Sequence, residues 1–158
     1  MKIFVVSDTH GYVDGFLDGI QDMARPDLII HLGDYVRDGI QIADETGIRT
    51  KIVKGNGDYF ERGYNEDEVF RLQGRTFLIT HGHKHRVRYG IDNLYYYARE
   101  VGADIVLFGH THVPLIMEES KMLIMNPGSP YLPRGLDRSK TFGIIEIGED
   151  ISGKILTI

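Results

Sequence analysis

The sequence predicts an α/β fold in which strands alternate with helices over the first two thirds of the chain and strands alone follow. Five short apolar runs rich in Ile and Val stop at polar or glycine residues, and the stretches between them carry helix-like spacing. After residue 115 the apolar runs follow one another without a helix. A chain of 158 residues, 42% of them hydrophobic, has the size of one domain, which we expect over residues 1–158.

The five runs are expected to be buried parallel strands because both of their faces are apolar. These strands are 3–6, 28–32, 51–53, 77–79 and 105–108. Amphipathic spacing predicts crossover helices at 13–23, 38–45 and 93–101. The last third should form meander-like antiparallel strands joined by short Gly- or Lys-bearing turns, at 115–117, 122–125, 142–147 and 155–158. The strand at 155–158 offers an exposed edge through which two copies could pair as a homo-oligomer.

The composition excludes several classes of function. There is no cysteine, so disulfides, thiolate zinc sites and a cysteine nucleophile are all ruled out. The net charge of −5 argues against strong nucleic-acid binding, which needs a basic surface that neutralises phosphates. No apolar run approaches the ~20 residues of a membrane helix, and no signal-peptide pattern is visible at the start. We therefore expect a cytoplasmic protein without a membrane partner.

Polar residues follow each of the five buried runs. In an open α/β sheet, ligands bind outside the carboxyl ends of the strands, so these residues should converge although they are scattered along the chain. They are Asp8 and His10, Asp34, Asn56 and Asp58, His81 and His83, and His110 and His112. Carboxylate, amide and imidazole groups suit Mn, Fe, Ni or Zn in a site without sulfur.

The spacing of these residues is also informative. In extended backbone, residues i and i+2 point to the same side, so Asp8 and His10 can bind one ion, and His110 and His112 can face one pocket. A carboxylate has two oxygens and can bridge two cations. Asp34 follows the central run and is the natural bridge, so the pattern favours two metal ions over one.

The ordered blocks Asp8-x-His10, Gly33-Asp34, Gly55-Asn56-x-Asp58, His81-Gly82 and Gly109-His110-Thr111-His112 resemble the calcineurin-like metallophosphoesterase superfamily. The resemblance is closest to its small single-domain bacterial and archaeal phosphodiesterases, and a later Asn126-Pro127-Gly128-Ser129 block also resembles that subgroup. It runs from residue 1 to about residue 129. Any one block would be a weak signal, but the five together are specific.

The resemblance implies a four-layer αββα sandwich and a phosphodiesterase that acts on a small phosphodiester, with hydroxide held between two divalent ions as the nucleophile. Manganese is the first choice of metal, with nickel, cobalt, iron or zinc as alternatives. One ion would be bound by Asp8, His10, Asp34 and His112, and the other by Asp34, Asn56, His81 and His110. Asp34, Asn56 and His81 are the expected catalytic residues.

One position departs from the family pattern. Many relatives carry a histidine directly after the Gly-Asn pair, where this chain has Gly57. A phosphomonoesterase function is weakened by this change, because that histidine helps to neutralise the transition state or protonates the leaving group. His83 and His85 are the remaining histidines near this edge, either as replacement acids or, more simply, as solvated loop residues. Either the site favours substrates with good leaving groups, or one of these histidines protonates the leaving group.

Basic residues near the expected site could contact a phosphate. Lys84, Arg86 and Arg88 form a cluster after the fourth strand, and Arg134 follows Pro133. Asn126–Ser129 could be a turn after a strand or part of the site edge. The Tyr95-Tyr96-Tyr97 group is more typical of a packed helix face or an oligomer contact than of a base-stacking platform.

Simpler interpretations stand beside the metal site. Asp8 and Asp34 could each cap a helix, although caps do not explain histidines at the ends of two strands. His31 lies inside an apolar run and is expected to be a core histidine. A non-catalytic protein-interaction scaffold is the main rival function, because the small metallophosphoesterase-like subunit of retromer uses the same fold. That subunit lacks parts of the ligand set, whereas this chain keeps all seven residues.

Overall fold

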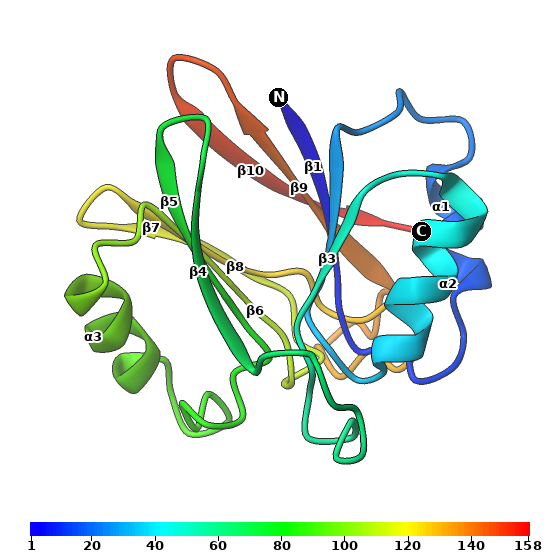
Figure 1. Ribbon diagram of the computed structural model, residues 1–158, viewed down its shortest axis with the longest axis horizontal. Helices are drawn as coiled ribbons and strands as arrows, with labels where there is room; N and C mark the ends of the chain where they lie inside the picture. Colours follow the sequence, from blue (N-terminus) through cyan, green and yellow to red (C-terminus); the bar gives the residue numbers. More distant parts are fainter.

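The computed structural model describes residues 1–158 as two facing β-sheets with helices on both outer sides (Figure 1). Helices α1 (Asp14–Ile20) and α2 (Val36–Thr46) cover one sheet, and α3 (Asp92–Glu100) covers the other. The layers therefore follow the order helix, sheet, sheet, helix. This arrangement confirms the αββα sandwich that the motif resemblance implied.

The first sheet has the strand order β10-β9-β1-β2-β3. Its members are β1 (Lys2–Val6), β2 (Leu28–His31), β3 (Thr50–Ile52), β9 (Thr141–Ile147) and β10 (Ile151–Thr157). β1, β2 and β3 run parallel, connected by the crossover helices α1 and α2, whereas β9 pairs antiparallel with both β1 and β10. β10 is an edge strand of this sheet.

The second sheet has the order β4-β5-β6-β8-β7. Its members are β4 (Asp67–Leu72), β5 (Arg75–Thr80), β6 (Ile105–Phe108), β7 (Leu115–Glu119) and β8 (Met122–Asn126). β5, β6 and β8 are parallel, and α3 forms the crossover between β5 and β6. The two edge strands, β4 and β7, pair antiparallel with their neighbours.

The alternating direction of side chains along the central strands explains how each sheet packs against the other sheet on one face and against helices on the other. Ile3 and Val5 of β1 point into the core between the sheets, while Phe4 and Val6 point to the opposite face, toward α1 and α2. Successive residues of a strand point to opposite faces, so a strand buried on both sides must be apolar throughout. The continuous run at 3–6 is the sequence counterpart of this double burial.

Three predictions about strands need correction. β4 was not predicted, because it is an edge strand that begins with Asp67 and Glu68 and is interrupted by Arg71, so it contains no apolar run. The last four strands do not form one meander, since β7 and β8 lie in the second sheet and β9 and β10 in the first. Residues 127–140 carry the chain from one sheet to the other instead of making a short turn. β3 is half-buried rather than buried.

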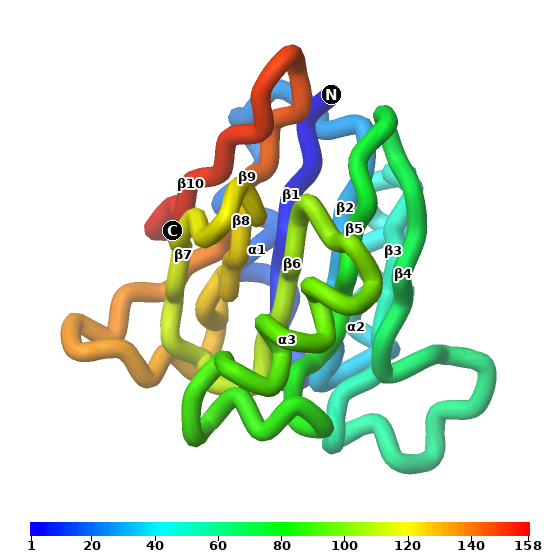
Figure 2. The backbone as a smooth tube through the Cα atoms, turned by 90° about the vertical axis from the view of Figure 1, so that its left-hand side faces the viewer, coloured from blue at the N-terminus to red at the C-terminus, as the bar shows by residue number.

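The carboxyl ends of the parallel strands meet at one end of the sandwich, where the longer loops gather (Figure 2). The loops after β3, after β5 and after β8 surround this end from three sides. The polar residues singled out in the sequence lie there. None of the three helices combines the length and the apolarity that crossing a membrane requires.

Phe142 offers a test of the packing between the first sheet and its helices. Its ring is 1% exposed and meets the rings of Phe4 and Phe16 edge-on, at centroid distances of 5.6 and 5.5 Å. We expect Phe142→Ala to lower the free energy of unfolding by about 3–5 kcal/mol, because it leaves a cavity that the sheet cannot close. Urea unfolding of this variant should be compared with that of Phe60→Ala, whose ring is 89% exposed. Equal stability of the two variants would contradict the packing described.

Candidate metal centre

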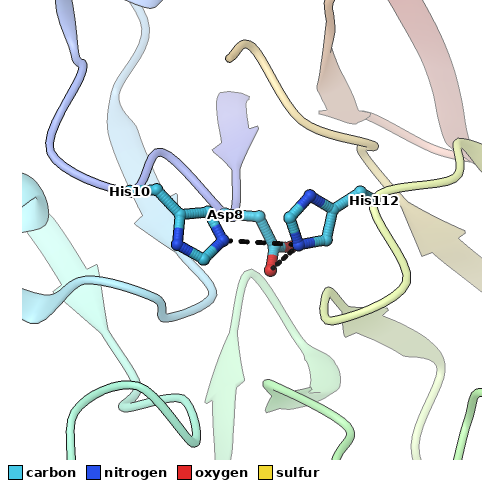
Figure 3. A group of neighbouring side chains, drawn as sticks. All are labelled: Asp8, His10 and His112. Atoms are coloured by element: carbon cyan, nitrogen blue, oxygen red, sulfur yellow. Dashed lines mark hydrogen bonds and ion pairs between the residues drawn. The ribbon is translucent and has the colours of Figure 1, made fainter. Parts of the chain in front are cut away.

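The structure brings the residues that follow β1, β2, β5 and β6 into two overlapping clusters of metal-ligating side chains. Asp8, His10 and His112 form one cluster (Figure 3), and Asp8, Asp34 and His81 form the other. Within each cluster the ligand atoms lie within 4.8 Å of one another. Asp8 belongs to both, so its carboxylate is the point at which the clusters join.

The first cluster is closely packed. The Asp8 Oδ1 atom lies 3.3 Å from His112 Nε2, and His112 Nε2 lies 3.3 Å from His10 Nε2. His10 Nε2 is also 3.9 Å from Asp34 Oδ2. Figure 3 shows the two imidazoles facing each other across the Asp8 carboxylate. Lone pairs of nitrogen and oxygen thus converge on one small volume.

Asp34 and His81 lie at the centre of the second cluster. His81 Nε2 lies 3.6 Å from Asp34 Oδ2 and 3.9 Å from Asp8 Oδ1. His110 Nδ1 lies 3.2 Å from His81 Nε2, so the fourth histidine of the predicted set adjoins this cluster. Asp34 Oδ2 faces both His10 and His81, a position between the two clusters that suits a bridging carboxylate.

Asn56 is the predicted site residue with the least contact. Its side chain is exposed and makes no hydrogen bond to the other six predicted ligands. The next residue, Gly57, donates its backbone N–H to Asp34 Oδ1 at 2.8 Å, which places the Asn56 segment beside the central carboxylate. The structure thus brings six of the seven side chains together and places the seventh at the rim.

Backbone carbonyls set the orientation and the tautomer of two histidines. Nδ1 of His81 donates to the Leu32 carbonyl, and Nδ1 of His112 donates to the Leu132 carbonyl, each at 2.7 Å. A carbonyl oxygen only accepts, so the proton is on Nδ1 and Nε2 presents its lone pair to the cluster. Burial lowers the pKa of His81 to about 3 and that of His112 to about 4. Both are therefore neutral near pH 7, the form that binds metal.

Asp8 carries the most perturbed carboxyl group of the site. Its side chain is fully buried. Oδ2 accepts hydrogen bonds from the Ser7 hydroxyl at 2.7 Å and the His110 backbone N–H at 2.9 Å, whereas Oδ1 has no hydrogen-bond partner. Burial raises the pKa of Asp8 to about 8, and the negative charge of Asp34 adds to this rise. The carboxylate is thus held in a position where its charge lacks a counter-ion from the protein.

The backbone around the site is held in unusual conformations. Five predicted ligands have left-handed backbone with φ between 45° and 68°, a conformation that non-glycine residues seldom adopt; they are Asp8, His10, Asp34, His110 and His112. Glycines permit the close approach of the loops. A β-carbon on Gly109 would collide with the Ser7 hydroxyl, and one on Gly55 would collide with the Asp34 carboxylate.

Asp58 is a supporting residue to which the sequence patterns assigned no role. Its buried carboxylate accepts the backbone N–H groups of Asp34, Val36 and Gly55, at 3.1, 2.7 and 2.8 Å. These bonds hold the loop after β2 against the loop after β3. The only signal in the sequence was its place in the Gly-Asn-x-Asp block, which does not reveal that this carboxylate faces backbone amides.

The Asn126–Ser129 block contacts the site loops directly. The Asn126 side-chain amide donates to the Gly109 carbonyl at 2.8 Å, and the Ser129 hydroxyl donates to the Asp8 carbonyl at 2.8 Å. Ser129 Oγ also accepts the Leu132 backbone N–H at 2.8 Å. Of the two interpretations of this block, the structure supports the site edge, because the block ties the loop after β8 to the loops after β1 and β6.

The structure also decides between the alternative roles expected for single residues. Neither α1 nor α2 has a side-chain N-cap, so Asp8 and Asp34 do not cap these helices. His31 is fully buried, with Nε2 2.9 Å from Thr9 Oγ1 and Nδ1 accepting the Gly33 N–H, as expected of a core histidine. Tyr95 and Tyr97 pack on the α3 side of the core, while Tyr96 is exposed.

The loop after β5 differs from the favoured expectation that its histidines are simply solvated. The side chain of His85 is only 13% exposed; it lies 3.2 Å from Asp67 and stacks on the ring of Tyr97. His83 lies 3.6 Å from Glu66, and its ring centroid is 5.5 Å from that of His81. Lys84 is ion-paired with Glu66. The acidic partners of these residues are Asp67, the first residue of β4, and Glu66 directly before it, and that strand was not predicted from the sequence.

Comparison with known proteins agrees with this geometry. Residues 1–150 match the calcineurin-like phosphoesterase superfamily domain. The chain is 36% identical to the probable metallophosphoesterase YsnB of Bacillus subtilis over 95% of this chain and 86% of that protein. It is 27% identical to the phosphodiesterase MJ0936 of Methanocaldococcus jannaschii, over 81% of this chain and 83% of that protein.

A solved structure gives the same result at the level of the fold. The crystal structure of an uncharacterized Streptococcus pneumoniae TIGR4 protein, described as a predicted phosphoesterase, superposes with a TM-score of 0.80. It is 32% identical in sequence, and the match covers 99% of this chain and 88% of that one. Motifs, fold and ligand clusters thus lead to one conclusion: the chain belongs to the calcineurin-like phosphoesterase superfamily.

Proposed function

We propose that the chain is a metal-dependent phosphodiesterase whose site binds two divalent cations. One cation would be held by Asp8, His10, Asp34 and His112, and the other by Asp34, Asn56, His81 and His110. Manganese is our first choice of metal, because oxygen and imidazole ligands without sulfur accommodate it. The relative named as a phosphodiesterase supports the choice of reaction.

The single observation that carries the proposal is the Asp8 carboxylate. An isolated charge in a protein interior is very costly unless a partner compensates it. Asp8 Oδ1 accepts no hydrogen bond, and His112 Nε2, 3.3 Å away, presents a lone pair rather than a proton, so the protein offers the ionised carboxylate no partner at this oxygen. With a pKa of about 8, Asp8 keeps a proton near pH 7 in the metal-free protein, and a cation that displaced this proton would be coordinated by both the carboxylate and His112, whose nearest atoms are 3.3 Å apart. The residues present therefore fit a divalent metal.

When bound, two cations would lower the pKa of a water molecule and stabilise negative charge on the phosphoryl oxygens. The protein holds the ligands for this task in advance. The Leu32 and Leu132 carbonyls fix the imidazoles of His81 and His112, and Gly57 N–H fixes the Asp34 carboxylate. Such outer partners orient the ligands, and the two carbonyls also raise the basicity of the imidazoles.

Gly57 supports a diester over a monoester substrate. Its backbone N–H serves Asp34, and a β-carbon at this position would lie 3.0 Å from Asp34 Oδ1. The position therefore supplies no side chain that could protonate a leaving group. A diester with a leaving group that departs as a stable anion needs no such acid. The scaffold alternative does not require seven retained ligands around a buried carboxylate, so we favour catalysis.

The role of Asp34 can be tested directly. Asp34→Asn keeps the size of the side chain and an acceptor for Gly57 N–H but removes the charge that would bridge two cations. We expect hydrolysis of bis(p-nitrophenyl) phosphate with Mn²⁺ to fall by about 100-fold or more, as for loss of a charge-stabilising group. The rate of p-nitrophenolate release is the measurement. Asp44→Asn, an exposed change on α2, is the matched control, and equal activity of the two variants would refute the bridge.

The buried charge of Asp8 predicts a pH-dependent stability of the metal-free protein. Folding raises the pKa of Asp8 to about 8 from an ordinary value of 3.8, so the folded state keeps a proton that the unfolded state releases. This contribution to stability is complete below about pH 4 and is lost as the pH rises toward 8. Asp8→Asn removes that loss, and its advantage over the wild type should grow by roughly 2.5 kcal/mol between about pH 5 and pH 7.

Urea unfolding in the presence of a chelator measures this difference at each pH. Asp44→Asn should follow the wild type across the range, because that carboxylate is exposed. A constant difference between Asp8→Asn and the wild type would show that Asp8 titrates normally. In that case burial would not raise the pKa of Asp8, and the description of this carboxyl group as buried without a partner would be wrong.

A further inference from the structure

A pocket of about 550 Å³ is lined in part by the loop that carries His110 and His112. Val87 and Phe108, which are 5% and 2% exposed, and the side chains of Ile91 and Val113 give it an apolar lining. Thr111, between the two histidines, also lines it, so the pocket and the centre share one loop. Its volume is that of a small-molecule site, and its apolar lining suits a flat ring.

Two arginines lie at this pocket, Arg88 from the loop after β5 and Arg134 from the loop after β8. Both are exposed and neither is ion-paired, although the chain has a net charge of −5. By contrast, Lys84 in the same loop as Arg88 is paired with Glu66. The Arg134 backbone N–H donates to the His112 carbonyl at 3.0 Å, which anchors this arginine next to the centre. Free guanidinium groups pair strongly with phosphate or carboxylate.

We infer that this pocket binds one ester arm of the substrate, and that this arm carries an apolar ring and a second anionic group. The inference rests on the proposed phosphodiesterase function. The ring would pack against Val87, Phe108 and Val113, and the anion would pair with Arg88 and Arg134. A small arm such as methyl could make neither contact. The pocket therefore determines which diesters bind well rather than how the bond is broken.

Three p-nitrophenyl diesters that differ only in the second arm test this inference. The arms are methyl, thymidine joined through its 5′ oxygen, and the same thymidine with a 3′-phosphate. In each case water adds to phosphorus and the bond to p-nitrophenolate breaks. The arm remains on the phosphomonoester product, and the proton of the water goes to solvent. We expect KM with Mn²⁺ to fall on the order of tenfold when the ring is added and again when the second phosphate is added.

Variants separate the two contacts. Arg134→Gln and Arg88→Gln should raise KM for the 3′-phosphorylated substrate alone, whereas Val113→Ser should raise KM for both thymidine substrates. Val113 is 40% exposed, so this change leaves the core intact. Arg71→Gln is the matched control, since Arg71 is exposed on β4. It lies near the end of that strand away from the proposed centre, and we expect it to change none of the three KM values.

Calorimetry separates failure of the pocket from failure of the proposed reaction. Thymidine 3′,5′-bisphosphate should bind to the Mn²⁺-loaded protein, and Arg134→Gln should weaken its binding about tenfold or more. If no diester is hydrolysed but this binding pattern holds, the proposed function fails and the pocket assignment survives. Equal KM values for the three arms, unchanged KM values in the pocket variants, or bisphosphate binding insensitive to Arg134 would each overturn the inference.

Discussion

Burial of the Asp8 carboxylate is the constraint on which the rest of the site depends. β1 is covered on both faces, and the chain leaves it at Asp8 between the two sheets, where no solvent reaches the side chain. One oxygen is satisfied by Ser7 and the His110 backbone, and the other faces the lone pair of His112. Loops from both sheets must approach this carboxylate, which explains the glycine at position 109.

The supporting hydrogen bonds form a frame around that carboxylate. Asp58 joins the loops after β2 and β3, and Ser129 joins the loop after β8 to the Asp8 carbonyl. The carbonyls of Leu32 and Leu132 turn two imidazoles so that their lone pairs face inward. The geometry for binding cations is thus built from backbone contacts of four loops, and left-handed backbone at five predicted ligands is part of the same frame.

Much of the fold could be predicted from the sequence, and the physical basis of the prediction also explains which strands it missed. Runs such as 3–6 and 105–108 are apolar on both faces, so their strands and the convergence of their polar ends were predictable. β4 was missed because it is an edge strand with charged residues on both faces, Arg71 on the outer face and Glu68 beside the core residues Phe70 and Leu72, so it shows no apolar run. The assignment of β8 and β9 to different sheets was also missed, since apolar spacing is the same in either sheet.

The candidate site, like the fold, could be predicted only in part. Ligand types and spacing indicated which side chains converge, and the structure brings six of the seven together while Asn56 stays at the rim. The role of Asp58 and the pocket between Val87 and Arg134 were beyond reach, because they depend on which segments pack side by side. The spacing of residues along one segment does not show which segments pack side by side. That becomes visible only when the loops are packed in the folded structure.

Anomalous diffraction from crystals of the chain grown with Mn²⁺ tests the proposed metal centre most directly. Two manganese peaks are expected, one enclosed by Asp8, His10, Asp34 and His112 and the other by Asp34, Asn56, His81 and His110. Asp34 is expected to contact both ions. A map with no peak at this end of the sandwich, or with manganese bound only at surface carboxylates, would contradict the central claim.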